Sequence, residues 1–160
     1  MRRLLLALVL CAALVGVGAA PASADSRVHA DGAFTVAITG PPDLQPLPGG
    51  RCLATIPVTL AFDGTLDGAA TGAIRVAVAA PCDLAFAVPP GTYADLFLFA
   101  GTFTGAVAGE QTSATLVYSG RSRPGGDVRG LIALHGDANG LLRVRATAGA
   151  GGTYSGAVRV

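Results

Sequence analysis

The sequence predicts an all-β domain of about eight antiparallel strands, forming either a closed barrel or a two-layer sandwich. From residue 33 onward, apolar residues alternate with polar or small ones, which is the pattern of half-buried strands. Segments rich in glycine interrupt this alternation every ten or so residues, as turns between strands do. No window shows the three-and-four spacing of an amphipathic helix, and frequent glycine disfavours long helices.

The N-terminal segment, residues 1–24, has the layout of a cleavable export signal. Arg2 and Arg3 form a basic start, and an apolar run of about 14 residues follows, shorter than the ~20 that span a bilayer. Small residues then place the cleavage site between Ala24 and Asp25. We therefore expect a single secreted, extracellular domain over residues 25–160 without a stable membrane anchor.

Cleavage changes the charge of the domain only slightly. It removes two of the 11 basic residues, so nine arginines remain against ten acidic residues, a net charge of −1. A nearly neutral chain lacks the basic footprint that binds nucleic acid or anionic lipid. We expect no nucleic-acid partner.

The strands follow one another with short breaks. The first covers residues 34–38, and the proline-rich segment 40–50 after it is expected to be a loop, because four prolines cannot pair in a ladder. The same alternation predicts the remaining strands, at residues 54–62, 74–78, 94–107, 112–119, 127–135, 141–147 and 153–160.

The strands at 54–62 and 74–78 form a predicted hairpin around the turn sequence DGTLDG. If Leu60 pairs with Ile74, the apolar side chains of both strands fall on one face, as burial requires. Pro57 lies in the middle of the first strand and donates no hydrogen bond, so we expect a bulge or a locally open ladder there.

Three cysteines are present, and Cys11 lies within the export signal. Cys52 and Cys82 remain as a pair in an oxidising compartment, where a disulfide is expected. The hairpin register that aligns the apolar residues also places Cys52 opposite Cys82.

Several glycine-flanked strand sequences carry a family resemblance: FDGTLDG, FTGAVAG, LVYSG, GDVRGLIALHG and GLLRVRATAGAGGTYSG. Over residues 54–160 the chain resembles bacterial proteins of uncharacterised function related to the allene oxide cyclase barrel. The resemblance implies an eight-stranded antiparallel, calycin-type barrel whose inward side chains fill the lumen or line a pocket for an apolar molecule. It also implies self-association, because barrels of this type are often oligomers.

No catalytic, metal or cofactor motif stands out. A Gly-x-Ser-x-Gly elbow is absent, and His29 and His135 are too few and too far apart for a zinc site. The plant cyclases use a buried glutamate, but Glu110, the single glutamate, falls in a predicted turn and does not align with that position. We expect no catalytic residue, no metal and no cofactor.

An aromatic-rich stretch offers the candidate binding residues. Such side chains line pockets for apolar ligands, and they also fill barrel cores, which the scarcity of other large residues favours. The carboxyl of Asp95 would have a raised pKa in a dry lumen, but a position in water at the strand end is the preferred interpretation. The candidate pocket residues are Phe86, Tyr93, Asp95, Phe97, Phe99 and Phe103.

Arginines gather in the C-terminal half, and their parity within the predicted strands places several on one face. An anionic partner is one interpretation of such a face, and a solvated surface is the preferred one. These residues are Arg121, Arg123, Arg129, Arg143 and Arg145.

Three functions are consistent with these features. The leading hypothesis is a secreted, non-catalytic barrel that binds a small apolar ligand or serves as an interaction module. The second is a cyclase- or isomerase-like enzyme, which requires Asp95, Glu110 or His135 to point into the lumen. The third is a structural envelope or surface protein.

Overall fold

Nine strands and one short helix make up the part of the chain that the computed structural model describes, residues 27–160. The predicted export signal and its cleavage site lie outside these residues. The elements are β1 Arg27–Ile38, β2 Asp43–Leu47, β3 Arg51–Gly64, β4 Leu66–Val78, α1 Cys82–Ala85, β5 Asp95–Val107, β6 Glu110–Ser122, β7 Asp127–Gly136, β8 Asn139–Thr147 and β9 Gly151–Arg159.

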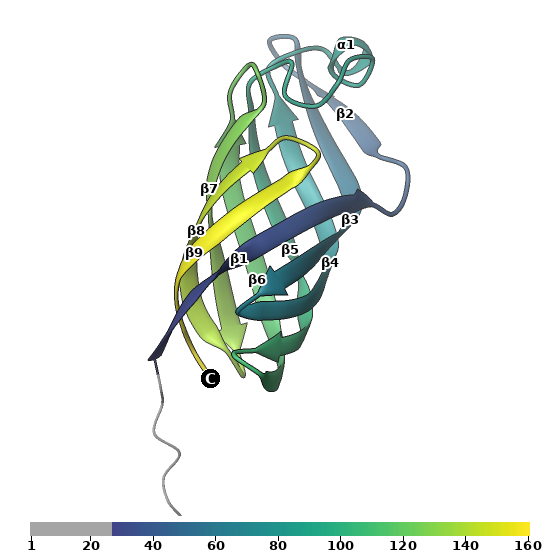
Figure 1. Ribbon diagram of the computed structural model, residues 1–160. Helices are drawn as coiled ribbons and strands as arrows, with labels where there is room; N and C mark the ends of the chain where they lie inside the picture. Colours follow the sequence, from purple (N-terminus) through teal and green to yellow (C-terminus); the bar gives the residue numbers. More distant parts are fainter. Residues whose placement is uncertain (1–26) are drawn as a thin grey trace, which may run out of the picture.

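Eight of these strands close into an antiparallel barrel (Figure 1). Neighbours along the chain pair from β3 through to β9, and β1 pairs with β9 on one side and with β3 on the other. The pairing of the first strand with the last confirms the predicted all-β barrel and excludes the sandwich. In Figure 1 the segment carrying α1 covers the upper end, and β1 begins at the lower end, where β9 finishes.

The extra strand β2 lies within the segment predicted to be a loop, so that prediction is wrong. Residues from Asp43 to Leu47 pair with the start of β3, and Pro46 lies opposite Cys52. β2 is the edge of the sheet with β3 as its one partner, and an edge strand tolerates proline because its outer side needs no hydrogen bonds.

The bulge expected at Pro57 is also absent. Pro57 pairs with Ala73 in an unbroken register along β3 and β4. Its carbonyl oxygen accepts a hydrogen bond from the Thr39 N–H (2.9 Å), just after β1 ends. The N and C=O groups of a strand residue point to the same side of the strand, so the nitrogen of Pro57 also faces the β1 and β2 side. The pairing with β2 has ended before Pro57 and the pairing with β1 begins after it, so the missing N–H leaves no ladder hydrogen bond unmade.

The predicted register of the β3–β4 hairpin is wrong by four residues. Leu60 pairs with Ala70 rather than Ile74, and Cys52 pairs with Val78 rather than Cys82. The last pair of this ladder joins Phe62 to Gly68, so the turn between the two strands spans residues 63–67, within the predicted DGTLDG segment. An even shift leaves every side chain on its predicted face, which is why the apolar pattern did not detect the error.

The predicted disulfide between Cys52 and Cys82 is confirmed, with the Cα atoms 4.8 Å apart. It does not lie across the ladder as expected. Cys82 begins α1, beyond the end of β4, so the bond joins the first turn of the helix to the start of β3.

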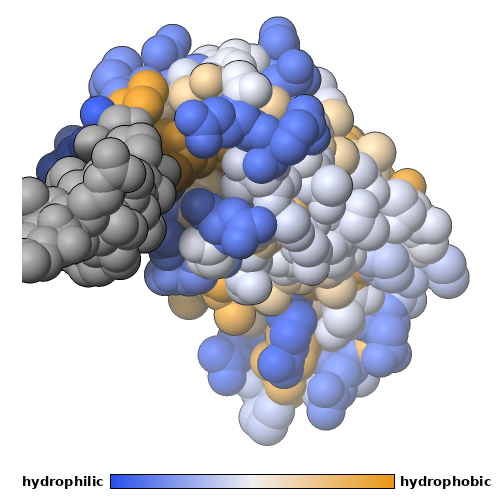
Figure 2. Space-filling model, turned by 90° about the horizontal axis from the view of Figure 1, so that it is seen from below, coloured by the Kyte–Doolittle hydropathy of each residue, from blue (hydrophilic) through white to orange (hydrophobic). Residues whose placement is uncertain are grey.

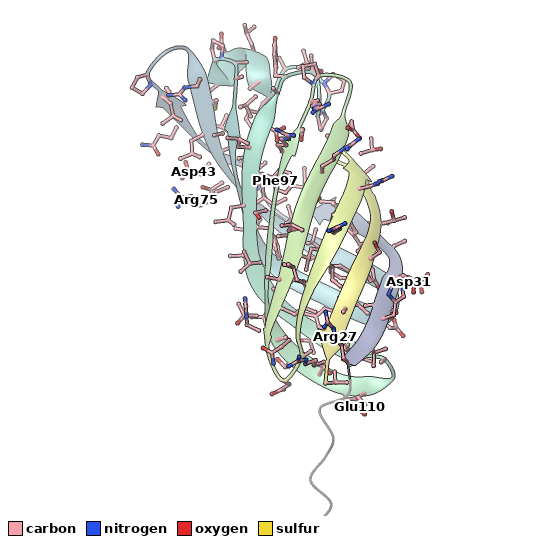
Figure 3. The ribbon with its side chains drawn as sticks, turned by 90° about the vertical axis from the view of Figure 1, so that its left-hand side faces the viewer. Arg27, Asp31, Asp43, Arg75, Phe97 and Glu110 are labelled. Carbon is pink, nitrogen blue, oxygen red and sulfur yellow. A yellow bond between two sulfur atoms is a disulfide. The ribbon has the colours of Figure 1, made fainter. Side chains whose placement is uncertain are left out.

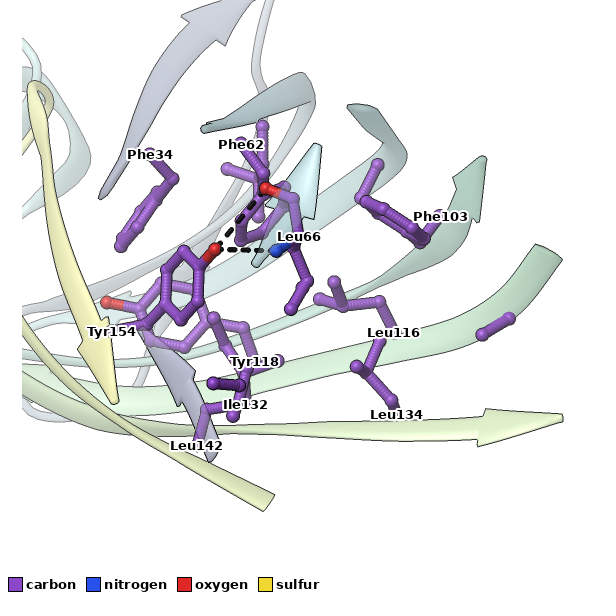
Figure 4. Packing of buried hydrophobic residues seen from close by; sticks show 14 of the residues in the cluster. Phe34, Phe62, Leu66, Phe103, Leu116, Tyr118, Ile132, Leu134, Leu142 and Tyr154 are labelled. Atoms are coloured by element: carbon purple, nitrogen blue, oxygen red, sulfur yellow. Dashed lines mark hydrogen bonds between the residues drawn. The ribbon is translucent and has the colours of Figure 1, made fainter. Parts of the chain in front are cut away.

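The core fills the lower part of the barrel, where rings and branched side chains from all eight barrel strands meet (Figure 4). The Tyr154 hydroxyl accepts a hydrogen bond from the buried N–H of Leu66 (2.8 Å) and lies 3.3 Å from the carbonyl oxygens of Leu66 and Asp63. A side chain from β9 thereby fixes the β3–β4 turn. Gly32, opposite Tyr154 in β1, leaves the room that this ring requires.

The lower end, seen in Figure 2, carries hydrophobic residues in small groups between hydrophilic and neutral ones. No helix among residues 27–160 combines the length and the hydropathy needed to cross a bilayer.

Candidate ligand-binding cavity

An apolar cavity of about 320 Å³ lies in the upper half of the barrel, between the packed core and the α1 end. This volume falls near the lower end of the range typical of small-molecule sites, roughly 300–1,000 Å³. Aliphatic side chains from β3 and β4 form much of its wall, and they include Ile56, Val58, Ile74, Val76 and Val78. The core and the cavity thus divide one continuous lumen.

Three aromatic rings, those of Phe34, Phe97 and Tyr118, both line the cavity and pack against the residues below it. Tyr118 meets the other two edge to face, with ring centroids 5.7 Å from Phe34 and 4.9 Å from Phe97. Such contacts hold the rings in fixed orientations. Figure 3 shows Phe97 within the upper half of the barrel.

A glycine opposite Phe97 sets the position of its ring. Gly120 is the cross-strand partner of Phe97, and a Cβ placed on Gly120 would lie 2.7 Å from the Phe97 ring. The Phe97 ring therefore packs against the backbone of β6 at Gly120, where no side chain is present. A Cβ at position 120 would also lie 2.7 Å from the Arg129 carbonyl oxygen, so a larger residue there would displace the Phe97 ring and the neighbouring backbone.

The upper end is crossed by residues 79–94, which we call the cap loop and which include α1. Its two ends are joined by a hydrogen bond from the Ala79 N–H to the Ala94 carbonyl (3.0 Å). Its far side is joined to the β6–β7 turn, where the Gly125 N–H donates to the Gly91 carbonyl (3.0 Å). Together with the disulfide at Cys82, these contacts hold the loop at both sides of the barrel.

Two exposed apolar side chains lie at the mouth of the cavity. Ile38, at the end of β1, is 65% exposed, and Phe86, in the cap loop, is 39% exposed, yet both line the cavity. Residues that face both water and the interior form a rim. The entrance therefore lies between the end of β1 and the cap loop.

One carboxyl lies in this apolar wall. Asp95 begins β5, faces Ser122 across the β5–β6 ladder, and accepts a hydrogen bond from the Ser122 hydroxyl (2.9 Å). Burial raises the pKa of Asp95 above its usual 3.8, and the hydrogen bonds from Ser122 oppose part of that rise. The interpretation of Asp95 as a water-exposed strand end is therefore not what the structure shows, because the residue is half-buried and lines the cavity.

Tyr118 brings a phenol close to this carboxyl. Burial raises the pKa of Tyr118, and the negative charge of Asp95 raises it further. The Tyr118 hydroxyl has no hydrogen-bond partner among residues 27–160, and its ring lines the cavity. This hydroxyl is free to bind a guest molecule.

The six candidate pocket residues divide between the cavity and the core. Phe86, Tyr93, Asp95 and Phe97 line the cavity. Phe99 and Phe103 are fully buried in the core below it. All four residues of this set that belong to β5 have odd numbers and share one face, so depth in the barrel rather than direction separates them.

The other polar candidates lie far from the cavity. Glu110 is exposed at the lower end (Figure 3), and His135 is exposed near the β7–β8 turn, also at that end. Of the three groups that an enzymatic interpretation required, only Asp95 points into the lumen.

Sequence reasoning missed Ser122 and Tyr118. Both belong to β6 and have the parity of the buried residue Leu116, so alternation along LVYSGRS contains the signal that they face inward. What alternation did not reveal is that β5 and β6 pair so as to bring Ser122 opposite Asp95.

The arginines gather on the outer surface as the parity predicted. Arg121 lies directly opposite Arg129, which lies directly opposite Arg145, so three arginines form a row across β6, β7 and β8. All three are exposed, and Arg129 pairs with Asp127 in its own strand (3.5 Å). The row lies outside the barrel and contributes nothing to the cavity.

Within the described range, no group of three or more His, Cys, Asp or Glu side chains is arranged to hold a metal ion. Fold and site together define a small, disulfide-linked β-barrel with a half-enclosed apolar cavity at one end. Comparisons with protein-family models, with curated proteins and with solved structures found no match to this chain. The relationship to the allene oxide cyclase barrel therefore stays a prediction.

Proposed function

We propose that this protein is a secreted, non-catalytic carrier or receptor that holds a small apolar molecule in the upper half of its barrel. The observation that carries the proposal is the cavity of about 320 Å³ with aliphatic walls and aromatic rings at its base. Burial of an apolar guest there removes hydrophobic surface from water, at about 25 cal/mol per Å².

The construction of the upper end supports a binding role. A barrel of eight strands is just wide enough to be filled by its own side chains or to hold one small ligand. Here the lower half is filled, whereas the side chains of the upper half leave a cavity of about 320 Å³ between them. The cap loop, held by the disulfide, shields the cavity without filling it.

A fluorescence titration tests the proposal directly. The neutral probe N-phenyl-1-naphthylamine emits strongly in apolar surroundings, and the chain contains no tryptophan to interfere. We expect saturable binding of one probe per barrel. Val76→Phe, which fills the cavity, is expected to weaken binding at least about tenfold, the effect of losing one good apolar contact site.

Ala77→Phe is the matched control, because it adds the same ring to the next residue of β4, which faces the outside. It is expected to leave probe affinity unchanged, and thermal unfolding would show that both variants are folded. No saturable binding to the wild type, or equal affinity in the two variants, would contradict the proposal. Such an outcome would leave the structural envelope role as the better hypothesis.

The proposal includes export from the cell and self-association of the barrel, and one measurement tests both. A disulfide is consistent with an oxidising, extracellular compartment. Native mass spectrometry of protein recovered from culture medium is expected to show a chain beginning at Asp25, lacking two hydrogens at the disulfide. The same spectrum counts subunits and detects any retained ligand. A chain that begins at Met1 with free thiols would refute export.

One observation favours a second candidate function, a cyclase- or isomerase-like activity. Asp95 is a half-buried carboxyl with a raised pKa inside an apolar cavity, and such groups serve as general acids. If this function holds, a ligand recovered from the native protein would be the product of the reaction. Its apolar precursor would then be converted by the wild type and left unchanged by Asp95→Asn.

A further inference from the structure

The cavity contains one charged side chain. Asp95 is the single acid among the residues that line it, and none of those residues is arginine, lysine or histidine. A carboxylate in apolar surroundings without a positive partner is costly to keep ionised. A cationic group that enters the cavity would therefore supply the counter-charge that the wall lacks and would stabilise the ionised form of Asp95.

The position of this carboxylate is fixed. Ser122 lies directly opposite in β6, is almost fully buried, and donates its hydroxyl to the Asp95 Oδ1 atom (2.9 Å). A carboxylate has about four acceptor sites, so hydrogen bonds from one serine leave capacity for a guest. The causes that act on the pKa of Asp95 are burial and Ser122, and no cationic side chain is among them.

Aromatic groups surround the same region. Tyr118 and Phe97 lie edge to face, 4.9 Å apart, and Tyr93 from the cap loop lines the cavity with them. The faces of such rings attract a cation within about 6 Å. The Tyr118 hydroxyl, which lies close enough to Asp95 to sense its charge, offers an oxygen that can accept from a donor bound between them.

From this arrangement we infer that the cavity takes a lipophilic primary amine, whose protonated nitrogen pairs with the Asp95 carboxylate while its apolar body fills the space above Phe34 and Phe97. The inference rests on the proposed function and narrows it to one ligand chemistry. A fatty-acid anion is disfavoured, because it would place a second negative charge beside Asp95. A neutral alcohol fits the space but leaves the carboxylate without a counter-charge.

Competition with three ligands of one chain length tests the inference. Octylamine, octanol and octanoate differ only in the polar group, and each is added to displace N-phenyl-1-naphthylamine from the folded protein near neutral pH. Octylamine is expected to displace the probe at a concentration about tenfold lower than octanol, the effect of one charge-assisted hydrogen bond. Octanoate is expected to be the weakest of the three.

Two variants locate the effect. Asp95→Asn keeps the shape and removes the charge, so it is expected to lose the preference for octylamine over octanol, with each displacement measured against the probe affinity of that same variant. Asp83→Asn removes an exposed acid from α1 outside the cavity and is expected to keep the preference. Retention of the preference in Asp95→Asn would overturn the inference.

The wild-type experiment is decisive even if Asp95→Asn fails to fold. Equal displacement by octylamine and octanol would refute the amine inference while leaving the binding of apolar molecules intact. Failure of the probe itself to bind would refute both. Displacement by octanoate at a lower concentration than octylamine would assign the cavity to an anion and overturn the role given to Asp95.

Discussion

At the scale of single residues, polar side chains inside the barrel have specific tasks. Asp95 and Ser122 form a hydrogen-bonded side-chain pair in the cavity wall, and the hydroxyl of Tyr154 fixes a turn from within the core. Alternation of the sequence assigned the apolar residues of β3 and β4 to the inward face correctly, but the inward positions of Asp95, Tyr118 and Ser122 were not predicted. It did not predict their partners, because partners depend on the register between strands, and shifts of two or four residues preserve the apolar face.

Tyr154→Phe is expected to destabilise the protein by about 1–3 kcal/mol, because the buried Leu66 N–H would lose its acceptor. Urea unfolding measures the difference. Tyr93→Phe is the control, since the Tyr93 hydroxyl makes no hydrogen bond within residues 27–160. If both variants unfold at the same urea concentration, the hydroxyl of Tyr154 does not support the turn as described.

Asp95 is expected to make stability depend on pH. Because burial raises its folded-state pKa above 3.8, its contribution is fully present below pH 3.8 and is lost as pH rises through the raised pKa. Asp95→Asn lacks this titration, so its stability relative to the wild type increases with pH across that window and then levels off. Urea unfolding of the two ligand-free proteins at several pH values measures the difference in their stability. A difference that does not change with pH would contradict the prediction.

At the scale of elements, β1 and β2 share one edge of β3 while β4 pairs along the other edge, and a covalent bond holds the cap loop. β1 pairs with the second half of β3 and β2 with the first half, a division that leaves Pro57 at the junction. The sequence predicted eight of the nine strands and the position of the β3–β4 turn, but it missed β2, began β1 and β4 too late and set the β3–β4 register four residues off. β2 was missed because its proline was taken as a loop residue, whereas an edge strand accommodates it.

Removing the disulfide by replacing both cysteines, Cys52→Ser with Cys82→Ser, is expected to lower stability by about 3–4 kcal/mol in the chain-entropy model. It also frees one side of the cap loop, so N-phenyl-1-naphthylamine should dissociate faster. Stopped-flow dilution of the loaded protein measures the rate. An unchanged rate would show that hydrogen bonds alone hold the cap loop.

The arginine row of β6, β7 and β8 is expected to cost stability, because like charges directly opposite in a sheet repel. Arg145→Thr should therefore stabilise the protein, by roughly 0.2–1 kcal/mol relative to Arg143→Thr. Arg143 is a fair control because it lies in the same strand opposite Leu131 and Ser155. The difference should shrink in about 1 M salt, where charges act over about 3 Å. If the stability difference between the two variants persists in salt, side-chain packing rather than charge repulsion causes it.

At the scale of the whole molecule, one lumen is divided into a packed half and a hollow half. Period-two strands predicted the all-β class but are shared by barrels and sandwiches, and only the pairing of β1 with β9 decides between them. The depth at which each inward residue lies was equally inaccessible, because it depends on the stagger of all eight strands. This is why Phe97 lines the cavity while Phe99 and Phe103 are core residues.

The pairing of Arg27 with Arg159 brings the two ends of the nine-stranded sheet together at the end of the barrel opposite the entrance. A short peptide linker would join these two ends. New termini between Ala108 and Gly109, in the β5–β6 turn, would then give a circular permutant in which every strand keeps its neighbours. For the same reason, a barrel immobilised on a sensor surface through either end would keep its entrance facing the solution.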